Sequence, residues 1–593
     1  MKKYIIPFAV FLAVGFVSCD DSLDLNPKDR VSEADYFKTE NDLELFTNPY
    51  YNNILSKTPY EEQNDLLVCQ NLSNEIRGGS ARSIPKSGGG WTWTDLRRMN
   101  SLLARVDRCP DEDAVVKYTA LTRFFRAYFY FEKVVRFGDV PWYDKELGSA
   151  DPDLYKSRDS RELVMTKMIE DVDYAIANLP DHKSQTNMPY RATKWAAMAL
   201  KARFCLFEGT FRKYHGLNLE GHDYKYYLEQ SAVAANELIT SGPYKIWSTG
   251  NTDKDYHDMF VAENANADEY ILAIKFDATT QSFHDAYGFS CVLSRGMPGL
   301  TRKFVNMYLM KDGSRFTDIP GWQEMTYAEE IQNRDPRLLQ SIRHPGFKLN
   351  GNACLPNLSE SVTGYNPIKF VQDGITRSDN STCDMPVFRI AEAMLNYAEA
   401  KAELGTLTQE DLDNTINVIR DRVGMAHLVM SAANSNPDWY LSSEDYGFTN
   451  VEGSNKGVIL EIRRERAIEL NQEGFRWADI RRWKAGNCYN QKFTGMYFPG
   501  PGEYDFDGDG NADLVLYGAN QSKPNVPSST PIFQIGVDGG IILTEGNKGY
   551  VDRHTTIEKV PFNEGRDYFY PIPSDEISLY KDKNPDFKQN PGW

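Results

Sequence analysis

The sequence predicts a mainly α-helical fold in which helical hairpins support an irregular, loop-rich region. Three observations lead to this prediction. Segments of about seventeen residues carry apolar side chains at helical spacing. Short turns containing Gly or Pro separate many of these segments, and the remaining stretches show no regular period. The helices lie within about 95–241 and 386–484, and the loop-rich regions are 70–94, 244–380 and 485–593.

Helices dominate the N-terminal half. They are expected at Asn41–Leu55, Asp95–Val106, Ala114–Phe137, Asp159–Leu179, Ala192–Glu208 and Tyr224–Thr240. The helix from Ala114 is apolar on most sides, which predicts burial. The helix from Ala192 is rich in alanine, so a neighbouring helix can approach it closely. Helices of this length joined by short turns are typical of tetratricopeptide-like hairpins, although no strict repeat of about 34 residues is visible.

The C-terminal half is expected to contain a strand-like run and further helices. The run covers Tyr270–Phe276, and the helices cover Thr301–Met310, Pro386–Leu404, Gln409–Val423 and Gly457–Lys484. Proline is favourable at the first position of a helix, and Thr408 with Asp411 forms a capping box. The two helices that follow residue 385 resemble the hairpins of the N-terminal half.

The first eighteen residues have the layout of a secretory signal. Lys2 and Lys3 precede an apolar run from Tyr4 to Val17. The run is too short to cross a bilayer as a helix, for which roughly twenty residues are needed. We therefore expect 1–18 to be a signal peptide and the chain to be exported.

A cysteine, Cys19, stands at the expected cleavage point. This resembles a bacterial lipobox, although Phe16 takes the place of the usual leucine. The resemblance implies cleavage before Cys19, acylation of its thiol and a lipid anchor on the membrane. Residues 19–38 would then be the lipidated tether and 39–593 the folded body. The alternative is an ordinary secreted protein with a chance cysteine.

Composition restricts the possible partners. The chain of 593 residues has 84 acidic and 66 basic side chains, a net charge of -18, which argues against nucleic acid as a ligand. Aromatic residues make up 13% of the chain, and exposed aromatic rings are what sugar faces stack on. Apart from Cys19, the cysteines are scattered without a C-x-x-C pair, so we expect mostly buried free thiols and at most one or two bridges.

Seven segments in this order resemble the SusD/RagB family of outer-membrane glycan-binding lipoproteins. They are Leu121–Trp142, Arg191–Thr210, Val305–Gly313, Asn333–Ile342, Phe388–Gly405, Glu461–Lys484 and Phe569–Trp593. The resemblance implies four tetratricopeptide-like hairpins, a looped ligand face and no enzymatic activity. It also implies a partner, a SusC-like TonB-dependent outer-membrane transporter on which the lipoprotein sits as a lid. Asp20 and Asp21 resemble the signal that sends some lipoproteins to the outer face of the outer membrane.

Two regions look like the places where members of this family contact their ligand, the loop 71–93 and the region 287–322. Aromatic rings there could stack on sugars, and amide or guanidinium groups could hold hydroxyls. The expected contacts are Asn74, Arg77, Trp91, Tyr287, Phe289 and Trp322, whereas Trp93 is assigned to the core. Ordinary packing remains an alternative for each.

The segment 505–513 resembles a calcium-binding loop. Asp505, Asp507, Asp509 and Asp513 take loop positions 1, 3, 5 and 9, and Gly510 takes the turn position. Position 12 is Leu516 instead of Glu, so the segment is not an EF-hand. We expect either a structural Ca²⁺ or a solvated acidic turn.

Arginines cluster between residues 463 and 482 with acidic residues interleaved at helical pairing distances. They are Arg463, Arg464, Arg466, Arg476, Arg481 and Arg482, with Glu461, Glu465, Glu469, Glu473 and Asp479. Internal ion pairing is favoured over anion binding. No H-E-x-x-H, G-x-S-x-G or phosphate-binding loop is present. The alternatives to a glycan-binding protein are an adaptor that binds protein or peptide and, less favoured, a glycosidase.

Overall fold

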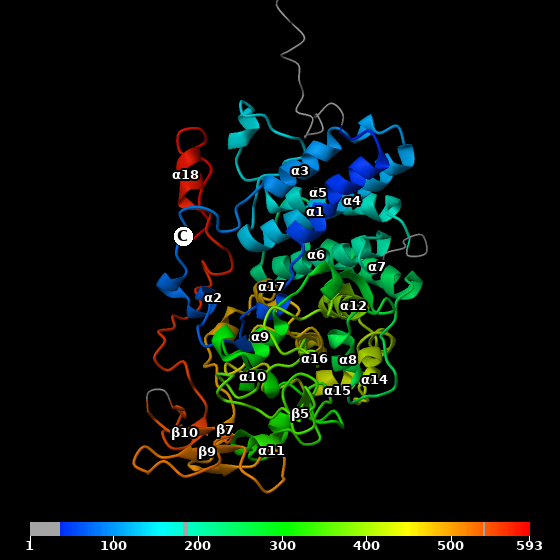
Figure 1. Cartoon of the computed structure of the whole chain (residues 1–593). Helices are drawn as coiled ribbons and strands as arrows, with labels where there is room; N and C mark the ends of the chain where they lie inside the picture. The colour runs from blue at the N-terminus through cyan, green and yellow to red at the C-terminus, as the bar shows by residue number, and fades with distance from the viewer. Residues whose placement is uncertain (1–35, 182–187, 538–539) are drawn as a thin grey trace, which may run out of the picture.

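The computed structural model describes residues 36–181, 188–537 and 540–593. Figure 1 shows a long body with stacked helices at one end and irregular chain with short strands at the other. The predicted signal peptide, Cys19 and nearly all of the tether lie outside the described residues. Within those residues, none of the helices is both long and apolar enough to cross a membrane.

Helical hairpins form the upper part of the body. The stacked helices are α1 (Glu40–Ile54), α3 (Thr94–Leu103), α4 (Glu112–Phe137), α5 (Arg161–Asn178), α6 (Lys194–His215), α7 (Tyr224–Ser241) and α12 (Ile390–Leu404). Helices α1 and α3 pack on α4, and α4 to α7 pack in chain order, with α12 against α7. The predicted mainly helical hairpin architecture is therefore confirmed.

Local chemistry explains where these helices begin and how closely they approach. The Asp111 carboxylate accepts a hydrogen bond from the Ala114 N–H (3.0 Å) and caps α4. Ser160 caps α5 in the same way, and the carboxylate of Asp223 caps α7. A Cβ atom on Gly209 of α6 would lie 2.7 Å from Leu228 Cγ, so only glycine permits the close contact between α6 and α7.

The prediction that Pro386 begins a helix is wrong. Pro386 lies within strand β6 (Met385–Arg389), which pairs antiparallel with β2 (Tyr270–Ile274), and α12 begins only at Ile390. Every residue of β6 is buried. A short buried strand and the first turn of a buried helix have the same apolar pattern, so the sequence could not separate them.

Three other predicted helices are shorter or interrupted. Of Thr301–Met310 only α10 (Arg302–Val305) is an α-helix, and Gln409–Val423 divides into α13 (Gln409–Asp413) and α14 (Ile416–Arg422). The block Gly457–Lys484 divides into α16 (Lys456–Glu469) and α17 (Arg476–Arg482). The break between α16 and α17 contains Gln472 and Gly474 at φ of 60° and 79°, the left-handed region that a helix cannot contain.

The remaining elements are short. The helices are α2 (Asn74–Arg77), α8 (Asp255–Val261), α9 (Ala286–Cys291), α11 (Tyr327–Glu330), α15 (Met430–Ser435) and α18 (Ser574–Tyr580). Strand pairs are β1 (Leu67–Val68) with β3 (Gly299–Leu300), β4 (Lys348–Leu349) with β5 (Asn352–Ala353), and β7 (Tyr497–Phe498) with β11 (Gly549–Tyr550). At the lower end, β9 (Leu514–Tyr517) lies between β8 (Gly502–Tyr504) and β10 (Ile532–Gln534).

A group of buried charges lies where α16 meets its neighbours, and we call it the ion-pair core. Its members are Glu269, Arg337, Arg389, Arg422, Glu465, Glu469 and Glu473. The Glu469 carboxylate pairs with Arg389 (2.7 Å), Arg422 (2.5 Å) and Arg337 (3.1 Å). All seven side chains are buried, so each charge depends on its partners for stabilisation.

Internal pairing of the arginines between 463 and 482 is confirmed with one exception. Arg464 pairs with Glu461, Arg466 and Arg482 pair with Asp479, Arg476 pairs with Asp65, and Arg463 lies 3.7 Å from Glu403. Arg481 instead donates to the Val135 carbonyl and lies over the rings of Trp477 and Tyr570. Burial lowers the pKa of Arg481 to about 10.

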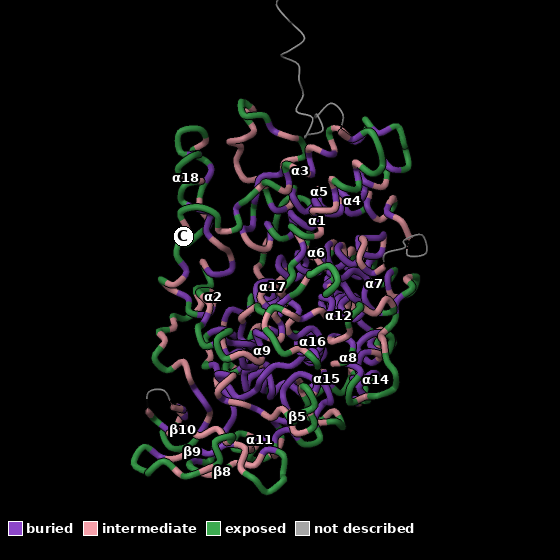
Figure 2. The backbone as a smooth tube through the Cα atoms, viewed as in Figure 1, coloured by how far each residue is buried: buried purple, intermediate pink, exposed green. Residues whose placement is uncertain are grey.

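Buried residues concentrate in the centre of the body, and exposed residues lie along its edges (Figure 2). The prediction of mostly buried free thiols is confirmed for the described part of the chain. Cys69, Cys109, Cys205, Cys383 and Cys488 are free and buried, and Cys291 and Cys354 are free and partly exposed.

Candidate functional site

The six predicted glycan contacts do not form one group. Asn74 and Arg77 begin and end α2, and both are exposed. Tyr287 lies in α9. The segment before α2 is joined to the segment after α9, because β1 pairs with β3 and the Gln70 N–H donates to the Gly296 carbonyl (2.8 Å). Trp91 and Trp322 are in other parts of the molecule.

Three of the aromatic rings predicted to contact a glycan differ in burial, which decides whether they can stack on a sugar. Phe289 is 7% exposed and contacts the Tyr60 ring at 5.7 Å between centroids. Stacking on a sugar needs an exposed ring face, so we leave Phe289 out of the proposed surface. Tyr287 is partly exposed. Trp322 is half-buried and makes edge contacts with Phe316 and Tyr440.

The two tryptophans of the glycine-rich loop have the opposite exposure to the one expected. Trp91 is 5% exposed and packs edge-on against Phe137 (4.9 Å). Trp93, assigned to the core from the sequence, is partly exposed and meets Tyr143 at 5.8 Å with perpendicular rings. The structure therefore makes Trp93 the more accessible ring.

Helix α4 holds the loop that carries these tryptophans. Lys133 Nζ donates to the Gly90 carbonyl, and Arg136 Nε donates to the Gly89 carbonyl (2.8 Å). Lys133 is buried against Phe129 and Trp93, and this burial lowers the pKa of Lys133 to about 8. The loop is thus fixed by two cationic side chains of one helix.

Both tryptophans line a cavity of about 410 Å³, which we call the aromatic cleft. Its rings are Trp91, Trp93, Tyr143, Tyr155 and Tyr580; its apolar walls are Leu96, Leu147, Leu154 and Leu579; and its polar residues are Thr94, Arg97, Asn100, Lys145 and Glu576. This volume is within the range of small-ligand sites, roughly 300–1,000 Å³. Rings with a few polar groups beside them are the lining that a sugar requires.

Three distant segments build the aromatic cleft. They are the segment 91–100, which carries both tryptophans and runs into α3, the loop 143–155, and α18, which comes from the C-terminal end of the chain. Asn100 of α3 is 2% exposed, and its Nδ2 donates to the carbonyls of Tyr143 (2.9 Å) and Lys145 (3.2 Å). The Tyr580 hydroxyl donates to the Leu154 carbonyl (2.8 Å). These bonds hold the rings in place before any ligand arrives.

The sequence analysis missed Tyr143, Tyr155 and Tyr580. Tyr143 follows the Gly138 and Pro141 that end α4, and an aromatic residue just after a helix stop could have been noted as a loop contact. No local pattern could have placed Tyr580 beside Tyr155, where the rings meet at 5.7 Å. Only the tertiary fold brings α18 to that position.

The aromatic cleft has two cationic lining residues, Arg97 and Lys145, and one acidic lining residue, Glu576. Lys145 pairs with Asp153 (2.8 Å), which is outside the cleft, and Arg97 Nη1 donates to the Leu147 carbonyl (3.0 Å). Glu576 is the one carboxylate among the described lining residues, and burial together with Asp575 raises its pKa. A pair of carboxylates facing each other across this cleft is therefore missing from its described lining.

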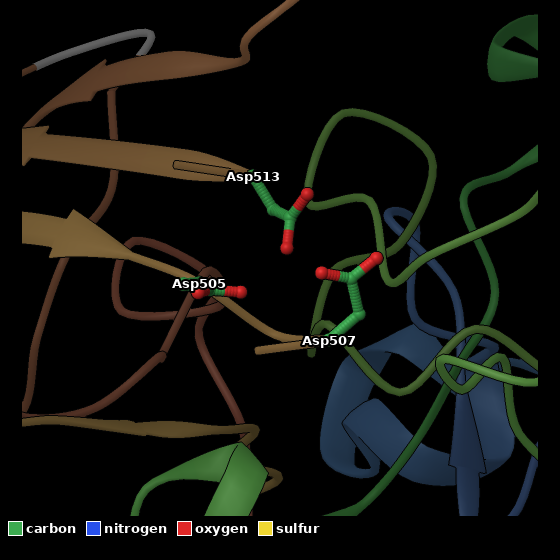
Figure 3. A group of neighbouring side chains, drawn as sticks. All are labelled: Asp505, Asp507 and Asp513. Carbon is green, nitrogen blue, oxygen red and sulfur yellow. The ribbon is translucent and has the colours of Figure 1, made fainter. Parts of the chain in front are cut away.

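Three of the four predicted calcium ligands come together. The carboxylates of Asp505, Asp507 and Asp513 have oxygens within 4.8 Å of one another, between β8 and β9 (Figure 3). Asp509 is outside this group, and its carboxylate accepts hydrogen bonds from Asn511. Burial and the neighbouring carboxylates raise the pKa of Asp513. Three hard oxygen donors of this kind suit a calcium ion.

The fold and the aromatic cleft define a class of protein, a helical-hairpin protein with an aromatic cleft on its helical stack. The chain belongs to the SusD family. The model of the SusD family matches residues 236–593, and a second model, described as starch-binding associating with outer membrane, matches residues 92–206. The resemblance stated from the sequence is confirmed.

Curated relatives and solved structures agree with this assignment. A SusD-like protein P38 of Formosa agariphila is 23% identical over 528 residues, which cover 81% of this chain and 92% of that protein. A SusD-like protein of Bacteroides ovatus is 22% identical and covers 86% and 90%. The crystal structure of a SusD-like carbohydrate binding protein from Bacteroides fragilis matches with a TM-score of 0.67 at 20% identity, over 93% of this chain and 99% of that one. At this identity the structural match establishes the fold.

Proposed function

We propose that this protein is a cell-surface lipoprotein that captures an oligo- or polysaccharide in the aromatic cleft. It then delivers the glycan to a SusC-like TonB-dependent outer-membrane transporter without cleaving it. The observation that carries this proposal is a cleft lined by the partly exposed rings of Trp93, Tyr143 and Tyr155, together with the buried rings of Trp91 and Tyr580, in a chain of the SusD family. Its polar residues Arg97 and Lys145 are exposed and can donate to hydroxyls.

A binding role is favoured over hydrolysis by the chemistry of the cleft. Most glycosidases need two carboxylates separated by about 5–5.5 Å or about 6.5–9.5 Å. Glu576 has no carboxylate opposite it among the described lining residues. The expected result is that purified protein retains a polysaccharide without producing reducing ends.

Affinity electrophoresis in gels that contain purified polysaccharides tests the glycan site. Trp93→Ala and Tyr155→Ala should each weaken retardation at least tenfold, because a stacked ring is lost. The matched control is Trp439→Ala, a tryptophan that is 48% exposed and does not line the cleft. If retardation were unchanged in both cleft variants and lost in Trp322→Ala, the glycan site would lie at Trp322 and not in the aromatic cleft. A screen in which only peptides bind would favour the adaptor function.

The membrane anchor is proposed from the N-terminal sequence. Cys19 carries the lipid, and the outer face of the outer membrane is the expected location. Cys19→Ser should release the protein from membranes while leaving glycan binding in solution unchanged. Retention of the Cys19→Ser protein on membranes would contradict the anchor. Pull-down of an outer-membrane transporter by the wild-type protein tests the partner.

We further propose a structural Ca²⁺ held by Asp505, Asp507 and Asp513. The support is the hard-oxygen donor set, whose oxygens lie within 4.8 Å of one another. When bound, the ion would supply the missing positive charge and hold the loop between β8 and β9. Asp509 is no longer included among the ligands.

A further inference from the structure

A second cavity, of about 390 Å³, lies where the helical stack meets the rest of the body, and we call it the junction cavity. Helices α4, α6 and α17, strand β6 and the segment after α1 line it. It shares no lining residue with the aromatic cleft. Any ligand of the junction cavity would therefore bind independently of the proposed glycan site.

Most charged groups of the junction cavity are neutralised by partners. Arg203 pairs with Glu392, Arg466 pairs with Asp479, Arg482 pairs with Asp479 and Glu399, and Glu473 pairs with Arg389 and Lys369. Each of these lining charges therefore has at least one buried partner of opposite sign. The choice of ligand for the junction cavity therefore depends on the lining residues that are not in these ion pairs.

Two carboxylates of the lining, Glu62 and Glu132, form no ion pair within the described residues. Glu132 of α4 is exposed within the lining and has neither a hydrogen bond nor an ion pair with any residue of the described chain. Glu62 accepts hydrogen bonds from the Trp477 N–H (3.1 Å) and Asn64 Nδ2 (3.3 Å), both neutral donors. Arg481, which acts on both acids, is outside the lining, whereas Arg203, which acts on Glu132, is within it.

The surroundings leave these two carboxylates under-compensated. Burial raises the pKa of Glu62 to about 7, although the Trp477 N–H, Asn64 and Arg481 act in the opposite direction. Arg203, Lys133, Arg136 and Arg481 act on the exposed Glu132 without forming an ion pair with it. A cation placed in the junction cavity would therefore gain an ion pair with a partly desolvated Glu62 and an unpaired Glu132.

The other walls suit a compact ligand with an apolar face. Tyr128, Phe131, Phe207, Phe475 and Trp477 contribute rings to the lining. The indole N–H of Trp477 is buried and has no acceptor in the described structure, and a ligand hydroxyl would accept from it only after a neighbouring side chain moves. We propose that the junction cavity binds a small hydroxylated organic ammonium ion, of which a protonated amino sugar is the simplest example.

Titration calorimetry of the whole protein with three matched sugars tests this proposal. Glucosamine carries the ammonium group, whereas N-acetylglucosamine and glucose are neutral. Glucosamine should bind at least tenfold more tightly than either neutral sugar, because only it can pair with Glu132 and Glu62. Equal affinity for glucosamine and N-acetylglucosamine, or no binding of glucosamine, would overturn the proposal.

Variants locate the binding. Glu132→Gln keeps the shape of the side chain and should weaken glucosamine binding at least tenfold, whereas Glu170→Gln, an exposed acid of α5, should not. Ala478→Phe, which fills the cavity from α17, should abolish binding and provides an independent variant. Wild-type affinity in both Glu132→Gln and Ala478→Phe would refute the assignment. Trp93→Ala should remove polysaccharide binding and leave glucosamine binding intact, so failure of one proposal can be told from failure of the other.

Discussion

The ion-pair core and the aromatic cleft are built in opposite ways. In the ion-pair core, the carboxylates of Glu469 and Glu473 are surrounded by buried cations, although Glu473 also lines the junction cavity. In the aromatic cleft, three half-buried rings and two buried ones, from three segments, leave a cavity of about 410 Å³ between them. The comparison indicates that this molecule separates stability from ligand binding, and the following predictions test how complete that separation is.

The largest effect is expected from breaking the ion-pair core. Glu469→Ala would leave Arg337, Arg389 and Arg422 buried without their shared partner. We expect a loss of about 3–5 kcal/mol in the free energy of unfolding, measured by denaturant titration. Glu170→Ala on the surface should cost less than about 1 kcal/mol. A loss below about 1 kcal/mol for Glu469→Ala would mean that the ion-pair core does not stabilise the fold.

A smaller effect is expected at Asn100, which both stabilises the fold and lines the aromatic cleft. This buried amide lies beside the aromatic cleft and holds the carbonyls of Tyr143 and Lys145. Asn100→Ala leaves those acceptors unpaired and should cost about 1–3 kcal/mol of stability. It should also weaken glycan retardation, because Tyr143 loses its support. Normal glycan binding at reduced stability would show that the two regions are more separate than we infer.

The regularity of the helical stack explains why much of the fold could be predicted. The starts of α4, α5 and α7 were predicted within two residues, because a side-chain cap or an apolar period marks each helix locally. Pairing among the arginines of 463–482 was also expected from helical spacing. The distant partners Arg337 and Arg389 were not, because nothing in the local sequence relates them to Glu469.

The aromatic cleft was harder to predict because, like the distant ion pairs of Glu469, it joins residues that are far apart in the sequence. The sequence places Trp91 and Trp93 in a glycine-rich loop, but which ring is accessible depends on how Phe137 and Tyr143 pack against them. Tyr580 approaches from the opposite end of the chain. A site assembled from distant segments has no spacing rule in the sequence, whereas a helix has one.

The third prediction concerns pH and the loop of the aromatic cleft. Lys133 has a pKa of about 8 in the folded protein, against about 10.4 for a free lysine. The folded state therefore releases this proton first, so stability should rise with pH between about 8 and 10.4, by about 1 kcal/mol from pH 8 to pH 9. Buried Lys369 acts with the same sign. The difference between wild type and Lys133→Met isolates the contribution, and identical pH profiles would contradict it.

The smallest effect is expected from calcium at the lower end of the body, far from both regions. Extracellular calcium modules bind with Kd of about 0.1–1 mM, and with Leu516 in place of the bidentate acid we expect the weak end of that range. At a calcium concentration equal to Kd, the stabilisation is about 0.4 kcal/mol.

Limited proteolysis of the loop between β8 and β9 is therefore a better measurement than melting. Calcium should protect the wild type and fail to protect Asp513→Asn. The matched variant Asp509→Asn lies in the same loop but outside the three-carboxylate group, so its protection should be unchanged. Equal loss of protection in both variants would restore Asp509 as a ligand and show that the loop closes further around the ion.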